Sequence, residues 1–259
     1  MSGPGARLVP MADLAELCRQ RPPGRAVHAT GGARATRGAR ATRGAREGKG
    51  GRDGRDARDG GVSVVAVDGP SGSGKSTLAG RLAGSLDCPI VHMDDLYPGW
   101  DGLADAVPRL LEWVLEPLAA GRYPRYRRYD WTAGEYAEWH EVDVAAEDGA
   151  AFLVLEGVGC GARAGAGHVS TLIWVEAARD ERFRRGILRD GEAYLPHWQR
   201  WANQEERHFA TEGTRRRADV VLDGEVDADR HAGGLLAVER WPEAAPPSSG
   251  REAQSSRVP

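Results

Sequence analysis

The sequence predicts an α/β fold in which a parallel sheet lies between layers of helices, and three observations support this prediction. Short apolar runs of buried-strand length alternate with helical patterns along the chain. A glycine-rich loop joins the first apolar run to a helix. Acidic residues follow two of the other runs, at the ends where parallel α/β sheets bind ligands.

The elements of the main domain follow one another over residues 62–224, about the usual size of one domain. In helix 108–120 the leucines and valines fall on one face, and Pro108 suits a first helical turn. Because strands and helices alternate, the strands should be parallel and covered on both faces. Strands are expected over Val62–Asp68, 89–93, 152–155, 171–175 and 218–222, and helices over 76–83, 108–120, 180–190 and 196–209.

The two ends of the chain differ in composition from the middle. Residues 1–23 contain a short amphipathic helix over 11–18, which could dock on the main domain through Met11, Leu14, Ala15 and Cys18. The Gly/Ala/Arg segment 24–61 repeats the hexapeptide 33–38 directly at 39–44, and is expected to be a disordered basic linker. Residues 225–259 are expected to be a mostly disordered tail.

Charge and composition exclude several classes of protein. The first 60 residues carry a net charge of +7 and the rest −10, but the basic segment has no aromatic residue on which bases could stack, so nucleic-acid binding is not expected. No apolar run approaches the ~20 residues of a membrane span, and no secretory signal is evident. The three cysteines match no zinc or disulfide pattern, which favours a cytoplasmic location. The oligomeric state is left open.

The loop over residues 69–76, with sequence GPSGSGKS, has the pattern of a P-loop. Its glycines allow φ > 0, so that successive N–H groups can turn inward around phosphates. Lys75, one of only two lysines in the chain, would place a compact charge near the β- and γ-phosphates. Ser76 should bind Mg²⁺, and Thr77 is placed to touch the α-phosphate. The sequence therefore predicts binding of ATP with Mg²⁺ through Gly69, Ser71, Gly72, Ser73, Gly74, Lys75, Ser76 and Thr77.

The acids at two strand ends suit phosphoryl transfer. Asp94 follows the second strand, where its carboxylate could accept the proton of an attacking hydroxyl group. Glu156 ends the strand 152–155 and could hold a magnesium-bound water, while Gly157 lets the backbone approach. The alternative is that these acids are plain helix caps.

Arginines in the helix 180–190 are candidates for stabilising the transferred phosphoryl group. Arg182, Arg185 and Arg189 are three or four residues apart, so they share a face and could act beneath a closing lid. Arg184 should point elsewhere and pair with surface acids. The alternative is a solvated helix in which Asp180 and Glu181 are the partners.

The acceptor is less well defined by the sequence. Six aromatic residues cluster in sequence around the expected acceptor pocket: Tyr97, Trp100, Tyr129, Trp131, Tyr136 and Trp139. They could form a pocket for a planar base or a sugar, or half of them could fill the core. Four nearby arginines could grip a phosphate on the acceptor, or form a solvated face beside acids such as Glu135 and Glu138: Arg122, Arg125, Arg127 and Arg128.

The motif 68–77, Asp94-x-Leu96-Tyr97, Leu155-Glu156-Gly157 and the arginine-bearing segment 182–190 resemble the uridine kinase and phosphoribulokinase family of small-molecule P-loop kinases. The resemblance covers residues 62–224 and implies a nucleoside-kinase-like fold with Asp94 as catalytic base. It places Tyr97 near the acceptor, Asp101 where the family holds ribose hydroxyls, and Tyr129 beside the base.

The lid departs from this family. An arginine pair follows the matching Arg-Asp in family uridine kinases, but here Gly191 and Glu192 follow Arg189-Asp190. The family's nucleoside-contacting histidine also has no clear counterpart, since His140 lies too far along the chain. The nucleotide side therefore matches the family better than the acceptor side.

Together these patterns predict an ATP-dependent kinase that transfers the γ-phosphate to a hydroxyl of a small metabolite, with a nucleoside as the leading candidate. Lys75, Asp94, Arg185 and Arg189 are the predicted catalytic residues, and Ser76 and Glu156 the metal-binding ones. The alternatives are a nucleoside monophosphate kinase and a nucleotide-sensing P-loop protein that transfers nothing.

Overall fold

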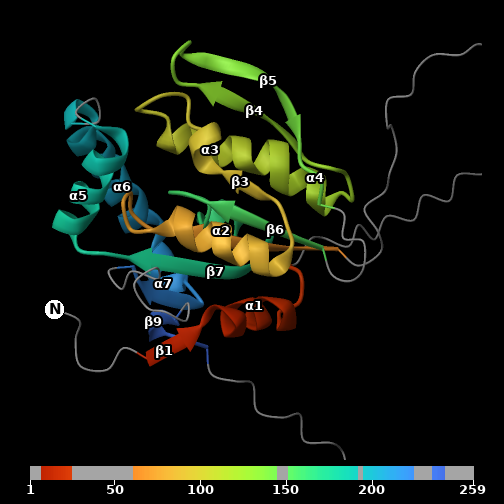
Figure 1. Ribbon diagram of the computed structural model, residues 1–259. Coiled ribbons are helices and arrows are strands. Elements are labelled where there is room, and N and C mark those ends of the chain that lie inside the picture. Colours follow the sequence, from red (N-terminus) through yellow and green to blue (C-terminus); the bar gives the residue numbers. More distant parts are fainter. Residues whose placement is uncertain (1–6, 25–60, 145–150, 192–194, 225–234, 243–259) are drawn as a thin grey trace, which may run out of the picture.

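The computed structural model describes residues 7–24, 61–144, 151–191, 195–224 and 235–242 (Figure 1). Its main sheet has seven strands in the order β1-β9-β8-β7-β2-β6-β3. Neighbouring strands are parallel from β8 to β3, whereas β9 runs antiparallel to both β8 and β1. The strands are β1 (Arg7–Pro10), β2 (Val62–Asp68), β3 (Ile90–His92), β6 (Ala151–Glu156), β7 (Val169–Glu176), β8 (Val220–Asp223) and β9 (Leu235–Arg240).

Helices cover both faces of this sheet, as the sequence predicts. Successive side chains of β2 point to opposite faces, so Val64 and Ala66 belong to one hydrophobic core and Val65 and Val67 to the other. The first core contains side chains of α3 (Leu103–Leu110), the π-helical segment η2 (Leu111–Leu115) and α6 (Leu195–Glu212). The second contains side chains of α1 (Met11–Gln20) and α2 (Lys75–Leu86). The α/β fold with a largely parallel sheet is therefore confirmed.

The helix predicted over 108–120 begins earlier than expected. α3 starts at Leu103, which places Pro108 inside the helix rather than in its first turn. A proline there has no N–H for the helical ladder, and the ladder continues as the π-helical η2 before α4 (Glu116–Ala119). Burial of Leu103, Ala106 and Leu110 against the core holds this first half in a helix despite the missing hydrogen bond.

The N-terminal helix docks on the main domain through the predicted side chains. Met11, Leu14, Ala15 and Cys18 are buried in the second core, and α1 packs against α2. The strand before it, β1, was not predicted. Neither was β9, which lies in the segment 225–259 that we expected to be mostly disordered. A short apolar run such as Leu235–Arg240 becomes a strand because β8 and β1 pair with it on both sides. The basic segment 25–60 and residues 243–259 lie outside the described residues.

A hairpin of β4 (Arg125–Asp130) and β5 (Glu135–Glu141), absent from the prediction, forms a second sheet near α3 (Figure 1). Its turn is closed by Asp130, whose carboxylate accepts hydrogen bonds from the amides of Thr132 and Ala133 at 2.8 and 2.9 Å. The remaining elements are the short helix η1 (Met93–Asp95), η3 (Arg163–Gly165), α5 (Arg179–Asp190) and α7 (Thr214–Arg217). No helix among the described residues is long and apolar enough to cross a membrane.

Candidate active site

The P-loop between β2 and α2 adopts a conformation that requires its glycines. Gly69, Gly72 and Gly74 have φ values of 142°, 79° and 100°. A side chain on Gly69 would also overlap the Val175 carbonyl, and one on Gly72 the Arg182 carbonyl. In the described part of the chain, no acceptor faces the amides of Gly72, Gly74, Lys75 and Ser76. These N–H groups line a cleft at the start of α2, an arrangement that can hold an anion.

Lys75 is the first residue of α2, and its side chain folds back over the loop. The side chain is buried, and its Nζ donates a hydrogen bond to the Pro70 carbonyl at 3.0 Å. The ammonium group therefore adds its charge to that of the helix N-terminus at the same cleft.

Ser76 and Glu156 come together from α2 and the end of β6. The Ser76 hydroxyl donates to Glu156 Oε1 at 3.1 Å, so two hard oxygen atoms lie side by side next to the free amides. Oxygen atoms of this kind are the ligands that Mg²⁺ prefers, and the ion keeps several waters and substrate oxygens around it. The two residues therefore fit the magnesium role that the sequence predicts for them.

His92 contacts the other oxygen of Glu156, with Nδ1 and Oε2 2.7 Å apart. This hydrogen bond to a carboxylate raises the pKa of His92. Burial alone would raise the pKa of Glu156, but the contact with His92 and the charge of Lys75 outweigh burial and lower it. Glu156 is therefore ionised at neutral pH, as a metal ligand must be.

Asp94 lies in η1, directly after β3, and its side chain faces a cleft. The residue is exposed toward this cleft, and the surrounding protein atoms partly desolvate its carboxyl group. Burial of the carboxyl group and the neighbouring charge of Glu156 raise its pKa, and Lys75 and Arg189 partly offset this. A carboxylate with a raised pKa is a better proton acceptor than an ordinary surface aspartate.

The cleft has a volume of about 670 Å³ and joins the P-loop to the region around Asp94. It brings together eleven of the residues predicted for the site: Ser71, Gly72, Gly74, Lys75, Ser76, Thr77, Asp94, Tyr97, Glu156, Arg185 and Arg189. The remaining lining comes from four aromatic side chains, Trp100, Trp131, His197 and Trp201, and from Gly157, Val158 and Gly186.

Four predicted site residues do not line the cleft. The amide of Gly69 donates to Asp68 Oδ1 at 2.7 Å, and Ser73 is fully buried with its amide donating to the Pro70 carbonyl at 3.2 Å. Asp101 is exposed and paired with Arg200 of α6, away from the cleft lining. Tyr129 packs edge-on against Trp131 and Tyr136 in the hairpin, one layer behind the wall.

Ser71 lines the cleft, but its polar groups are already used. Its amide and its hydroxyl both donate to Glu205 Oε1, at 2.8 and 2.5 Å. Both polar groups are therefore directed at α6, and the nucleotide contact expected through Ser71 stays a prediction.

The arginines of α5 do not act as one group. Arg189 and Arg185 line the cleft, and Arg185 Nη1 donates to the carbonyls of Gly224 and Gly72 at 2.9 and 3.4 Å. Arg182, expected on the same face, instead lies behind the P-loop and donates to the Ser71 carbonyl at 3.3 Å. Arg184 is exposed and pairs with Glu181 at 2.6 Å, as predicted.

The predicted aromatic cluster divides into two groups. Tyr97, Trp100 and Trp131 line the cleft, and the Trp131 indole donates to the Asp94 carbonyl at 3.1 Å. Tyr129, Tyr136 and Trp139 belong instead to a second group with Trp113, outside the cleft.

The arginines around β4 do not line the cleft. Arg125 lies over the Trp139 ring at 4.9 Å, Arg127 donates to the carbonyls of Ala137 and Tyr136, and Arg128 pairs with Asp95 at 3.1 Å. The acids Glu135 and Glu138, the partners expected from the sequence, are not the ones contacted by these three arginines. A phosphate on the acceptor would find none of these arginines within the cleft.

Sequence reasoning missed the contribution of α6. Trp201 and His197 line the cleft, with the His197 ring stacked on Trp100 at 4.3 Å. Glu205 holds the P-loop from behind. The spacing of Trp201 and Glu205, four residues apart, places them on one helical face, but the sequence alone does not reveal what that face contacts.

Comparison with known proteins finds likenesses among solved structures. No protein-family model matches the chain, and no curated protein matches it significantly. Among solved structures, a possible uridine kinase from Bacillus stearothermophilus is 22% identical, with a TM-score of 0.47, over 63% of this chain and 90% of that one.

Two further neighbours are more distant still. A putative fructose transport system kinase from Silicibacter sp. TM1040 is 20% identical (TM-score 0.41, 63% of this chain and 89% of that one). A shikimate kinase from Bacteroides thetaiotaomicron is 14% identical (TM-score 0.36, 65% and 90%). At these levels the substrates of the neighbours do not transfer to this chain.

Proposed function

We propose that this protein is an ATP-dependent kinase that transfers the γ-phosphoryl group to a hydroxyl of a small acceptor, with a nucleoside as the leading candidate. One observation carries the proposal: a single cleft joins the free P-loop amides and Lys75 at one end to the Asp94 carboxylate and an aromatic wall at the other. Such a cleft can hold a triphosphate and a hydroxyl-bearing ring in line.

In this reaction the acceptor hydroxyl loses its proton to the Asp94 carboxylate as its oxygen bonds to the γ-phosphorus. The bond from that phosphorus to the β-phosphate oxygen breaks, and ADP leaves. Lys75 and the amides of Gly72 and Gly74 hold the phosphates, while Arg189 stabilises negative charge near Asp94. Mg²⁺, held by Ser76 and Glu156, would neutralise charge on the β- and γ-phosphate oxygens.

The wall near Asp94 supports an acceptor with a flat ring and no phosphate. Trp100, Trp131 and His197 offer ring faces and edges. The lysine and arginine side chains of the cleft lining, Lys75, Arg185 and Arg189, come from the P-loop helix and α5, and none comes from this wall. We therefore place a nucleoside ahead of a nucleoside monophosphate.

The proposal is tested by measuring ADP release with MgATP in the presence of nucleosides, nucleoside monophosphates, sugars and vitamins. Stimulation by a nucleoside, absent in Lys75→Ala, is the expected result. If only nucleoside monophosphates stimulate ADP release, the acceptor is a nucleoside monophosphate and not a nucleoside. No stimulation by any compound, in a protein that binds MgATP, would favour a nucleotide sensor without transfer activity.

A further inference from the structure

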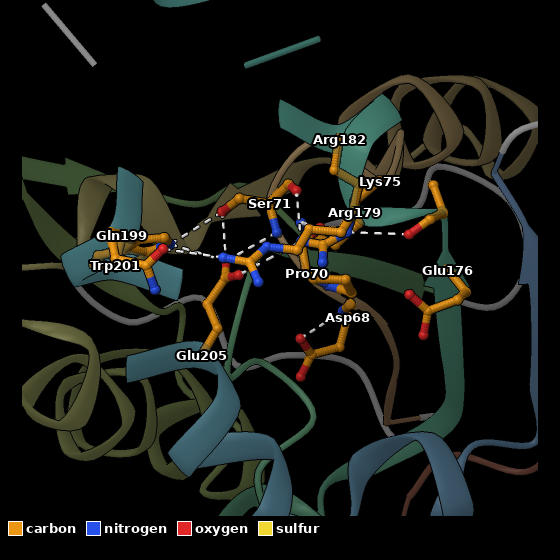
Figure 2. A network of polar contacts seen from close by, with 12 residues as sticks. Asp68, Pro70, Ser71, Lys75, Glu176, Arg179, Arg182, Gln199, Trp201 and Glu205 are labelled. Carbon is orange, nitrogen blue, oxygen red and sulfur yellow. Dashed lines mark hydrogen bonds and ion pairs between the residues drawn. The ribbon is translucent and has the colours of Figure 1, made fainter. Parts of the chain in front are cut away.

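The buried carboxylate of Glu205 on α6 has no part in the proposed transfer, yet it contacts the P-loop directly (Figure 2). Glu205 is only 3% exposed. Its Oε1 atom accepts three hydrogen bonds: from the Ser71 amide at 2.8 Å, the Ser71 hydroxyl at 2.5 Å and the Trp201 indole at 2.9 Å. A buried carboxylate with three donors on one oxygen is strongly fixed in place.

Arg182 contacts the carbonyl group of Ser71, the residue whose amide Glu205 holds. Its Nη1 donates to the Ser71 carbonyl at 3.3 Å and lies 3.9 Å from Glu205 Oε2, while its Nε donates to the Ala177 carbonyl at 3.1 Å. Both the N–H and the C=O of Ser71 are therefore held by charged side chains, one from α6 and one from α5.

These two contacts determine the direction of the neighbouring peptide groups. A trans peptide unit is planar, so its C=O and N–H point in opposite directions. Because Glu205 holds the Ser71 N–H, the Pro70 carbonyl of that peptide points away from Glu205, and Lys75 Nζ contacts it at 3.0 Å. Because Arg182 holds the Ser71 carbonyl, the Gly72 N–H points away from Arg182, and this amide is free in the described structure.

The same carboxylate is also linked to the wall of the cleft. Trp201 lines the cleft, and its ring packs edge-on against Tyr97 at 4.8 Å. Its indole N–H is shared between Glu205 and the Ser71 hydroxyl, 3.0 Å away. Glu205 therefore links the P-loop, through Ser71, to the aromatic wall of the cleft, through Trp201.

We propose that Glu205 is a positioning residue that sets the orientation of the P-loop amides through Ser71, so that the affinity for MgATP depends on α6. This inference rests on the proposed function only in that the loop binds MgATP. It does not require phosphoryl transfer.

The test is calorimetric titration of the full chain with MgATP. Glu205→Ala should weaken the affinity about tenfold, because three donors lose their acceptor and the Ser71 peptides become free to turn. Glu205→Gln keeps a carbonyl acceptor without the charge and should fall between this variant and the wild type. The matched control is Glu206→Gln, one residue along α6 and exposed, which should bind as the wild type does.

A double-mutant cycle separates positioning from general stability. Ser71→Ala should weaken binding more in the wild-type background than in Glu205→Ala, because the hydroxyl bond to Glu205 that it removes is already absent in Glu205→Ala. A lower melting temperature with unchanged affinity in Glu205→Ala would overturn the proposal. If the Ala variant does not fold, wild-type affinity in both Glu205→Gln and Ser71→Ala would overturn it instead. If the wild-type protein binds MgATP but transfers phosphate to no acceptor, the proposed function is refuted and the role of Glu205 is not.

Discussion

The two ends of the cleft are built in different ways. The nucleotide end, which is the P-loop, is made of backbone that packs closely against its neighbours. Gly69 lies against β7 and Gly72 against α5, and Gly224, directly after β8, lies against Ser73. In each contact a side chain on the glycine would overlap the neighbouring carbonyl. The acceptor end is made of side chains on a loop, a hairpin turn and α6, and Trp131 there is 41% exposed. The first end resists change, whereas the second can vary in its side chains without altering the backbone.

The largest expected effect comes from the Asp94 carboxylate at the acceptor end. Asp94→Asn keeps the shape of the side chain but cannot take the acceptor proton, so kcat should fall about 10³-fold. The dissociation constant for MgATP should change less than twofold, as measured by calorimetry. The control is Asp95→Asn, since Asp95 pairs with Arg128 and Tyr126 and does not line the cleft. Turnover retained in Asp94→Asn would reject Asp94 as the base.

The next effect concerns Asp68, the last residue of β2, which contacts the first glycine of the P-loop. This fully buried carboxylate accepts amide hydrogen bonds from Gly69, Gly159 and Gly161. Burial nevertheless raises its pKa from 3.8 to about 6. Because the folded state then binds the proton more tightly than the unfolded chain, the contribution of Asp68 to stability is greatest below pH 4 and is lost as pH rises toward 6.

The size of that loss is roughly 3 kcal/mol between about pH 4 and pH 6. Urea unfolding of the wild type and of Asp68→Asn at pH 4 and pH 7 measures it, since both proteins carry the same other titrating groups. The free energy of unfolding should fall more steeply with pH in the wild type. Equal slopes in the two proteins would contradict the assignment.

Gly224→Ala tests the close packing of the nucleotide end alone. A Cβ on Gly224 would overlap the Ser73 carbonyl oxygen, so the P-loop has to shift. We expect affinity for MgATP to fall about tenfold and the melting temperature to fall by about 5 °C. The acceptor KM should stay the same. Gly80→Ala is the control, because a Cβ there meets no atom within 4 Å. An unchanged MgATP affinity in Gly224→Ala would show that the contact is not needed.

The smallest expected effect belongs to the acceptor end. Trp131→Phe keeps an aromatic ring but removes the N–H that donates to the Asp94 carbonyl, so the acceptor KM should rise about fivefold with the MgATP affinity unchanged. Trp139→Phe lies on the same hairpin and is similarly exposed at 46%, but it does not line the cleft. Steady-state kinetics give the acceptor KM of both variants. An equal rise in KM for the two would show that Trp131 is not part of the acceptor site.

Much of the fold could be predicted because it depends on local patterns. The parallel strands are continuous apolar runs, and the predicted face of α1 is the buried one. β1, β9 and the β4–β5 hairpin were missed, since short or polar strands owe their structure to their partners rather than to their own composition.

The sequence by itself predicted where the P-loop lies, because glycines at fixed spacing between a strand and a helix permit the positive φ angles that this loop adopts. Only the tertiary structure decided how that loop is held and what stands opposite it. Glu205, Trp201 and Gly224 reach the loop from segments more than 100 residues away, and Arg182 turns behind it instead of into the cleft. Contacts of this kind depend on how helices and strands pack, which no local pattern of residues records.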